Sequence, residues 1–258
     1  MLLALILISL SLTSLPIERI AVQVDSVKVA AYAANLSADL PLLVLLHGSP
    51  GDWTAMRKYL EDSSIQQKYR IISITRPGYG ESDSSQAYPD LRFQGSVLHA
   101  FISKYATQKP VTILCHSLGG AIAMRYALDY PNEVQNMILL APTVSKHAER
   151  PKFYNHLAKI PWINKRLRHE MQISNVEMLQ LPAQLDQMEL EYPTIKANIW
   201  LFHGKMDMIA PYENARLLLK TIPKHLLTFT MYRTQNHFIP WTKFEDIKAL
   251  LLTELVKS

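Results

Sequence analysis

Three polar side chains of this chain have the types that nucleophilic hydrolysis needs. Ser117 stands in the stretch Leu-Cys-His-Ser-Leu-Gly-Gly, directly after an apolar run at 110–114. A serine hydroxyl is a poor nucleophile at neutral pH, so it requires a base and a third group that orients the base. Asp207 follows Ser117 by 90 residues and His237 follows Asp207 by 30, and each comes just after an expected strand. These residues are therefore candidates for nucleophile, orienting acid and base.

Ser117 lies where an expected strand turns sharply into an expected helix. The run at 110–114 is apolar and rich in β-branched residues, whereas 121–128 holds good helix formers. The usual nucleophile-elbow pattern is G-x-S-x-G; here Cys115 replaces the first glycine and Gly119 is the second. Such a turn predicts an exposed hydroxyl, with a serine–glycine turn that has no chemistry as the alternative.

Strands alternate with helices along most of the chain. Apolar and β-branched runs predict eight strands, at 20–24, 27–34, 41–46, 69–74, 110–115, 134–140, 199–203 and 226–231. Helices are expected after Ser117 and at 53–66, 91–105, 213–221 and 241–256. This alternation predicts an α/β fold with a mostly parallel eight-stranded sheet and helices on both faces.

The segment 143–196 interrupts this alternation. It contains no expected strand, several helix-like stretches and many basic residues. We interpret it as a helical lid inserted into a core formed by 18–142 and 197–258. Its apolar residues are expected to line a pocket over Ser117, with packing of the lid onto the core as the alternative. They are Phe153, Tyr154, Leu157, Ile160, Trp162, Ile163, Met171, Met178, Leu179 and Leu181.

Basic residues also gather in this segment. They lie close in sequence to Trp162 and Ile163, and they are Lys159, Lys165, Arg166 and Arg168. The group is either a surface that faces lipid or a solvated helix face.

The N-terminus differs in composition from the rest of the chain. Residues 1–12 carry no charge, and the first charged side chain is Glu18. The apolar stretch has about the length of a signal-peptide core and is too short to span a bilayer alone. Residues 1–17 are therefore expected to be an export signal or a short anchor, with membrane association through residues 1–16. The alternatives are an apolar extension packed on the body and a cytoplasmic protein.

Composition excludes several classes of protein. Hydrophobic residues make up 48% of the 258 residues, which is too many for a disordered chain. The net charge of +5 is mildly basic, but no Lys/Arg run with interleaved aromatic residues and no zinc-ligand spacing occurs, so no nucleic-acid partner is expected. Cys115 is the one cysteine, so no intramolecular disulfide can form. We expect it to be a small buried packing residue.

Five ordered motifs resemble those of the α/β-hydrolase superfamily, over nearly the whole chain after about residue 18. They are HGSPG at 47–51, RPGYGES at 76–82, CHSLGG at 115–120, HGKMD at 203–207 and the late His237. Two departures from the family pattern are Cys115 at the elbow and Thr75, where relatives often carry Asp before R-P-G-Y-G. The second departure concerns a structural turn.

The resemblance implies a role for five residues. Ser117 is implied as the nucleophile, His237 as the base and Asp207 as the orienting acid. The backbone N–H groups of Ser49 and Leu118 are implied as the oxyanion hole. The other motif histidines, at 47 and 203, each precede a glycine at a strand end and are expected to be structural. The histidine at 116 is expected to point into the sheet.

The same resemblance implies a serine hydrolase that cleaves carboxylic esters through an acyl-enzyme at Ser117, without a metal or an organic cofactor. Its substrate would be a small-molecule ester with an apolar acyl or alcohol part. Epoxide hydrolases and haloalkane dehalogenases of this superfamily use a carboxylate nucleophile, and the serine at position 117 disfavours both. A carbon–carbon bond hydrolase, a peptidase and a non-catalytic binding protein on this fold remain alternatives.

Overall fold

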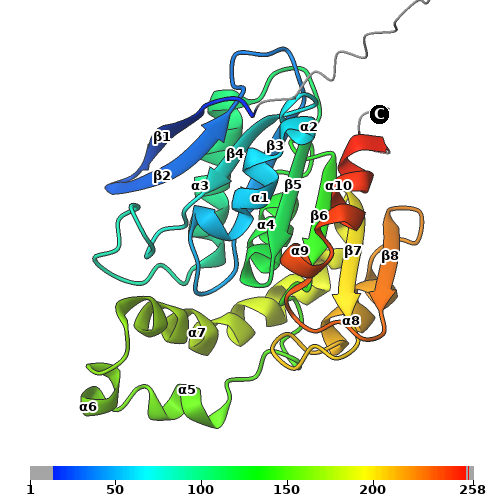
Figure 1. The fold of residues 1–258 in the computed structure, drawn as a ribbon. Helices are drawn as coiled ribbons and strands as arrows, with labels where there is room; N and C mark the ends of the chain where they lie inside the picture. Colours follow the sequence, from blue (N-terminus) through cyan, green and yellow to red (C-terminus); the bar gives the residue numbers. More distant parts are fainter. Residues whose placement is uncertain (1–13, 254, 256–258) are drawn as a thin grey trace, which may run out of the picture.

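The computed structural model describes residues 14–253 and residue 255. Within this part of the chain, eight strands form one sheet in the order β1-β2-β4-β3-β5-β6-β7-β8, and Figure 1 shows the sheet at the centre of the molecule. The strands are β1 (Ile17–Val24), β2 (Val27–Ala34), β3 (Leu42–Leu46), β4 (Arg70–Ile74), β5 (Val111–His116), β6 (Asn136–Leu140), β7 (Asn198–Gly204) and β8 (Leu227–Tyr232).

The sheet is mostly parallel, as predicted. β1 pairs antiparallel with β2, and β2 pairs antiparallel with β4. Every other pairing, from β4 through β3 and β5 to β8, is parallel. The carboxyl ends of the parallel strands therefore meet at one edge, which is where α/β proteins place their sites.

Helices pack against both faces of the sheet, and the predicted fold class is confirmed. One hydrophobic cluster joins the sheet to the helices that contain Phe101, Ile122 and Leu218. A second cluster joins the opposite face to those that contain Tyr59 and Ile247. The helices are η1 (Trp53–Met56), α1 (Arg57–Glu61), α2 (Ser63–Gln66), α3 (Leu91–Tyr105), α4 (Leu118–Asp129), α5 (Phe153–Leu157), α6 (Pro161–Asn164), α7 (His169–Glu191), η2 (Tyr192–Thr194), α8 (Glu213–Thr221), α9 (Ile239–Thr242) and α10 (Phe244–Thr253).

Two segments expected as single helices are broken. The segment 53–66 divides into η1, α1 and α2. Asp62 separates α1 from α2, because it has an extended backbone (φ −70°, ψ 116°) and its carboxylate accepts hydrogen bonds from the N–H groups of Ser64 and Ile65. An Asp that caps the next helix in this way ends the one before it. At the other end of the chain, α9 and α10 are separated at Lys243 (φ −121°, ψ 28°).

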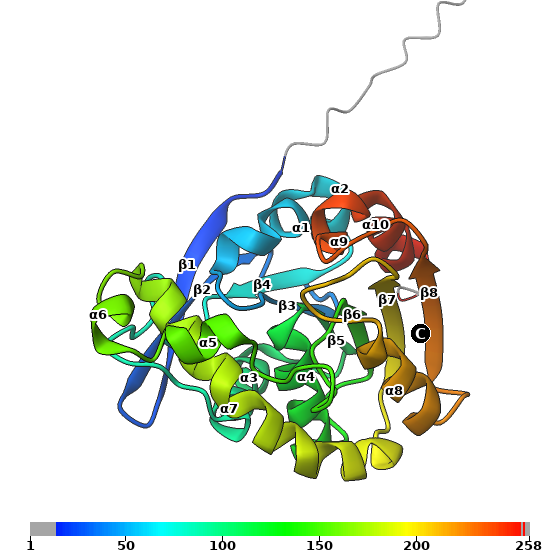
Figure 2. The same ribbon diagram turned by 90° about the horizontal axis from the view of Figure 1, so that it is seen from below.

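The segment 143–196 contains α5, α6, α7 and η2 and, as expected, no strand. α5, α6 and α7 lie beyond the carboxyl edge of the parallel strands (Figure 1), and they lie in front of the sheet when the molecule is turned (Figure 2). The segment therefore lies on the side of the sheet where Ser117 follows β5.

The predicted export signal or anchor, residues 1–17, lies mostly outside the described residues. Of that stretch the structure describes residues 14–17, and the backbone N–H of Leu15 donates to Gln66 Oε1 at 2.6 Å. Among the residues that the structure describes, no helix is long and apolar enough to cross a membrane.

Candidate active site

Ser117 occupies a strained turn between β5 and α4. Its backbone has φ 54° and ψ −122°, in the left-handed region that a side chain disfavours. Gly119 makes the turn possible, because a Cβ there would lie 2.8 Å from the carbonyl oxygens of both Leu46 and His47. Strain of this kind is typical of functional positions, where the surrounding structure holds a side chain in one orientation.

Backbone hydrogen bonds hold this turn from both sides. The N–H of Ser117 donates to the carbonyl of Leu140 at 3.1 Å, and its own carbonyl accepts from the N–H groups of Gly120 (2.8 Å) and Thr143 (3.1 Å). Cys115 is fully buried, and its thiol donates to the carbonyl of Ile138 at 3.5 Å. The cysteine that replaces the usual glycine is therefore a packing residue, as expected.

Asp207 and His237 are brought together by the loops that follow β7 and β8. His237 Nδ1 lies 2.8 Å from Asp207 Oδ2. The other carboxylate oxygen of Asp207 accepts from the N–H groups of Ile209 and Ala210, both at 2.9 Å. Because the carboxylate can only accept, Nδ1 carries the proton and Nε2 is left with a free lone pair. This is the tautomer that a general base needs.

A glycine allows the two loops to approach each other. A Cβ at Gly204 would lie 2.3 Å from the carbonyl oxygen of Gln235, which is two residues before His237. Glycine is therefore required at this position of the HGKMD motif on steric grounds, because any larger residue would push the His237 loop away from Asp207.

The side chain of His116 contacts the loop that carries His237, whereas the sequence predicted that it points into the sheet. Its Nε2 donates to the carbonyl oxygen of His237 at 3.0 Å, and the two rings lie 4.5 Å apart between centroids. Burial, and then the neighbouring His237, lower the pKa of His116 to about 3, so its ring is neutral at ordinary pH. The residue before Ser117 thus contacts the loop that carries the candidate base, which the sequence pattern did not indicate.

His47 and His203 are fully buried and hydrogen-bonded to backbone groups. His47 Nδ1 donates to the carbonyl of Gly48 at 2.7 Å, and its Nε2 accepts from the N–H of Arg76 at 3.0 Å. Burial, then the charge of Arg76, hold the pKa of His47 well below its usual range. His203 Nε2 donates to the carbonyl of Ala210 at 2.9 Å. Both residues hold loops at the carboxyl edge.

The two residues expected to supply oxyanion-hole donors lie beside Ser117. A Cβ at Gly48 would lie 2.8 Å from the Cβ of Ser117, so the loop that carries Ser49 passes directly against the serine. Leu118 is the first residue of α4, where a backbone N–H has no acceptor within the helix. Both N–H groups therefore belong to segments in contact with Ser117 or adjacent to it.

A buried ion pair joins α7 to the loop after β4, and hydrogen bonds join both partners to the Ser49 loop. Arg76 Nη1 lies 2.6 Å from Glu177 Oε1, and both side chains are at most 2% exposed. Glu177 Oε2 accepts hydrogen bonds from the hydroxyls of Ser49 and Tyr79, each at 2.6 Å. Arg76 Nη2 also donates to the carbonyl of Gly48 at 2.8 Å. Nothing in the sequence pattern singled out Glu177.

A cavity of about 570 Å³ lies between the sheet edge and the segment 143–196, with Ser117 and Ser49 in its lining. Five of the ten apolar residues expected to face a pocket line it, namely Tyr154, Leu157, Ile163, Met171 and Met178. The other five are not among its lining residues. Glu149 also lines the cavity, and its Oε1 accepts from Asn214 Nδ2 at 2.7 Å.

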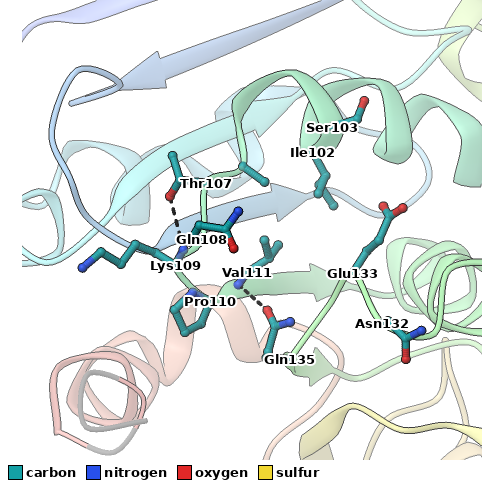
Figure 3. A pocket seen from close by; sticks show the side chains of 11 residues that line it. Ile102, Ser103, Thr107, Gln108, Lys109, Pro110, Val111, Asn132, Glu133 and Gln135 are labelled. Atoms are coloured by element: carbon teal, nitrogen blue, oxygen red, sulfur yellow. Dashed lines mark hydrogen bonds between the residues drawn. The ribbon is translucent and has the colours of Figure 1, made fainter.

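A second hollow, of about 420 Å³, lies at the opposite edge of the sheet (Figure 3). Val111 at the start of β5 and Gln135 before β6 line it, together with Lys109 and Glu133. Ser117 follows the other end of β5, so this hollow is separate from the candidate site.

Comparison with known proteins gives a family match. A family model described as alpha/beta hydrolase fold matches residues 41–170. A proline iminopeptidase, PfmaB of Pestalotiopsis fici, is 29% identical over 134 residues, which are 51% of this chain and 48% of the relative. Human epoxide hydrolase 4 is 24% identical over 221 residues, 77% of this chain and 59% of the relative. The chain thus spans about half the length of these curated relatives.

The fold is also shared with solved structures. An esterase from Exiguobacterium antarcticum superposes with a TM-score of 0.70 at 21% identity, covering 92% of this chain and 99% of the esterase. At this identity the likeness concerns the fold.

Proposed function

The chain belongs to the α/β hydrolase fold family, and on that basis we propose that it is a serine hydrolase which cleaves carboxylic esters through an acyl-enzyme at Ser117. The observation that carries the proposal is the 2.8 Å hydrogen bond between His237 Nδ1 and Asp207, because it leaves Nε2 able to accept a proton. The strained turn that presents Ser117 to an apolar cavity supports it.

In the proposed reaction, Ser117 Oγ bonds to the acyl carbon while its proton passes to His237 Nε2. Asp207 stabilises the imidazolium that forms. The tetrahedral intermediate then collapses, the ester C–O bond breaks, and the alcohol leaves with the proton from His237. A water molecule, deprotonated by the same nitrogen, then attacks the acyl carbon to give a second tetrahedral intermediate. This collapses with cleavage of the bond to Ser117 Oγ, which takes the proton back from His237 as the acid leaves.

The oxyanion of each tetrahedral intermediate is held by the backbone N–H groups of Ser49 and Leu118. Backbone donors fixed in place before the reaction are effective because they need no reorganisation as charge develops. The N-terminus of α4, a helix of 12 residues, adds a favourable field at the same point.

Residues 143–196 act as a lid that selects the substrate. Its side chains supply most of the apolar lining of the cavity, which suits an ester with an apolar acyl or alcohol part. The core is then formed by 18–142 and 197–258.

A peptidase is the second candidate, favoured by the similarity to a protein named proline iminopeptidase. The same three residues serve amide and carbon–carbon bond hydrolysis, so the leaving group distinguishes the candidates. An amine is a poorer leaving group than an alkoxide, and the proposal therefore expects ester turnover to exceed turnover of the matched amide.

A panel of p-nitrophenyl esters of increasing chain length tests the proposal, with p-nitroanilides of the same acyl groups beside it. Faster hydrolysis of the esters supports an esterase. Faster hydrolysis of aminoacyl anilides would support the peptidase. Binding of both compounds without turnover would indicate a non-catalytic protein.

Residues 1–17 serve export or membrane attachment, because the composition of residues 1–12 is apolar and free of charge and the first charged side chain is Glu18. A deletion should stop before Leu15, whose N–H bonds to Gln66. A protein that lacks residues 1–13 should stay folded and lose export or recovery in the membrane fraction. Unfolding of the shortened protein would show that the segment belongs to the core.

A further inference from the structure

The outer part of the segment 143–196 exposes large apolar side chains. Phe153 is 76% exposed, Tyr154 62% and Trp162 63%. They lie on α5 and α6, which Figure 1 shows beyond α7, on its side away from the sheet. We call residues 150–169 the outer lid. Aromatic side chains gathered at an exposed edge mark a surface that binds something.

The charge of the outer lid has one sign. Residues 150–169 contain no Asp or Glu, and all six of their Lys and Arg side chains are exposed, namely Arg150, Lys152, Lys159, Lys165, Arg166 and Arg168. The guanidinium of Arg166 lies 5.8 Å from the centre of the Trp162 ring. A cationic side chain thus lies directly beside an exposed aromatic ring of the outer lid.

Two carboxylates lie next to the outer lid, and both have partners. Glu170 pairs with Arg168 at 2.9 Å. Glu149 accepts a hydrogen bond from Asn214 and lines the cavity. The surface therefore keeps a net positive charge that favours an anionic partner.

The cavity reaches the surface within the outer lid. Tyr154 and Leu157 both line the cavity and are exposed, and Met171, just after the outer lid, does the same at 45% exposed. Whatever covers the outer lid therefore also faces the entrance to the cavity. An apolar partner there would shield these side chains from water.

We propose that the outer lid docks on an anionic lipid surface. Trp162 and Phe153 enter the boundary between headgroups and acyl chains, while the Lys and Arg side chains contact the lipid phosphates. Both halves of this recognition are required: aromatic side chains suit the interfacial region, and each basic residue near an anionic leaflet adds to the attraction. The cavity entrance then opens toward the lipid, from which an apolar ester can enter.

The test is co-sedimentation of the full chain with vesicles of phosphatidylcholine and phosphatidylglycerol at 7:3, and with pure phosphatidylcholine. Residues 1–13 are present in every protein, so any binding through them is common to all. Two double variants each change one component of the surface. Phe153→Ser with Trp162→Ser removes exposed aromatic side chains, and Lys165→Glu with Arg166→Glu reverses two positive charges. None of these four residues lines the cavity.

Two control variants make the same kinds of substitution outside the outer lid. Leu190→Ser alters a side chain of α7 that is 82% exposed, and Lys104→Glu with Lys109→Glu reverses two exposed charges at the opposite edge of the sheet. Thermal melting of each protein shows that it is folded. The readout is binding, so it does not depend on whether Ser117 is a nucleophile.

The expected result is an excess of binding to the anionic over the pure phosphatidylcholine vesicles, a difference that cancels what the charge-free residues 1–13 contribute to both. This excess should fall by about tenfold or more in each outer-lid variant and by less than about twofold in the controls. High salt should weaken it. The proposal is overturned if the full chain ignores anionic vesicles, if it binds pure phosphatidylcholine equally well, or if both outer-lid variants bind like the controls. Any of these results would indicate that the outer lid contacts a protein partner or solvent and not a lipid surface.

Discussion

Ser49 and Glu177 are joined by a 2.6 Å hydrogen bond between the serine hydroxyl and the carboxylate. Ser49 belongs to the loop after β3, and Glu177 to α7, which lies across the carboxyl edge of the sheet. Since Glu177 also holds the buried Arg76, one carboxylate fixes the position of α7 relative to the loop expected to supply an oxyanion donor. The segment 143–196 and the loop that carries Ser49 are thus directly connected.

Glu177→Ala should therefore destabilise the protein by about 3–5 kcal/mol, because it leaves the guanidinium of Arg76 buried without its partner. Urea denaturation measures the loss. Gln184→Ala is the matched control, since Gln184 on the same helix bonds to the N–H of Leu91, away from the Ser49 loop. A loss no larger than that of the control would show that the buried ion pair does not hold α7 in place.

Asp207→Asn should lower kcat by about 10⁴-fold, the effect of the same change in the serine-protease template. The amide can donate to Nδ1, so His237 would be held with its proton on Nε2, where it cannot act as a base. Steady-state kinetics on a p-nitrophenyl ester measures this. Asp246→Asn on α10 is the control, because its carboxylate bonds to the hydroxyl of Tyr232 instead. A fall of less than about fivefold would move the acid elsewhere.

Glu149 gives the protein a pH-dependent stability. Burial is the main cause that raises its pKa to about 7 from an ordinary value of 4.5; the hydrogen bond from Asn214 and the charge of Lys152 act in the opposite direction. Between these two values the unfolded chain has lost the proton while the folded protein keeps it. The free energy of unfolding therefore falls as pH rises from about 4.5 to about 7 and then levels off.

Glu149→Gln removes this contribution, so the variant should lose less stability than the wild type over that range. Urea unfolding at pH 5, 6, 7 and 8 provides the comparison. Glu189→Gln on α7 is the control, because its carboxylate accepts from the backbone N–H of Lys146 at 2.6 Å and does not line the cavity. The assignment fails if the wild type and Glu149→Gln show the same slope of unfolding free energy against pH.

Substitutions of two residues on α7 distinguish a role in substrate selection from a role in packing. Met171 lines the cavity, whereas Leu181 is 1% exposed and belongs to the core cluster. Met171→Ala should change the ratio of kcat/KM between long and short esters, by roughly 10- to 200-fold at most per carbon. Leu181→Ala should leave the ratio unchanged and cost about 2–5 kcal/mol of stability. If neither variant moves the ratio, the lid does not select the acyl chain.

The sequence predicted those strands and turns whose formation depends on residues close together in the chain. Continuous apolar runs are sufficient to mark parallel strands that are buried on both faces, such as β3 and β5. The loops that hold Ser117, Asp207 and His237 follow the parallel strands β5, β7 and β8, so topology alone predicts that they meet at one edge.

Contacts between distant segments could not be predicted in this way. Glu177 lies on a long helix whose pattern gives no sign that a buried Arg76 faces it. The contact between His116, at the end of β5, and the His237 loop is not predictable in this way, because the pattern along β5 says nothing about a loop 121 residues later. The composition on both sides of Asp62 favours one continuous helix, and it gives no sign that the carboxylate of Asp62 competes with that helix by bonding to the N–H groups of Ser64 and Ile65.

The central claim is that Ser117 is the nucleophile, and covalent labelling tests it most directly. A fluorophosphonate probe should form one adduct per chain, located on Ser117 by mass spectrometry of the peptides, with loss of ester hydrolysis in proportion to labelling. Ser117→Ala should melt like the wild type, take up no probe and keep at most about 10³-fold acceleration over water from the remaining site. Full ester turnover by Ser117→Ala, or an adduct on another residue that accounts for the lost activity, would contradict the account.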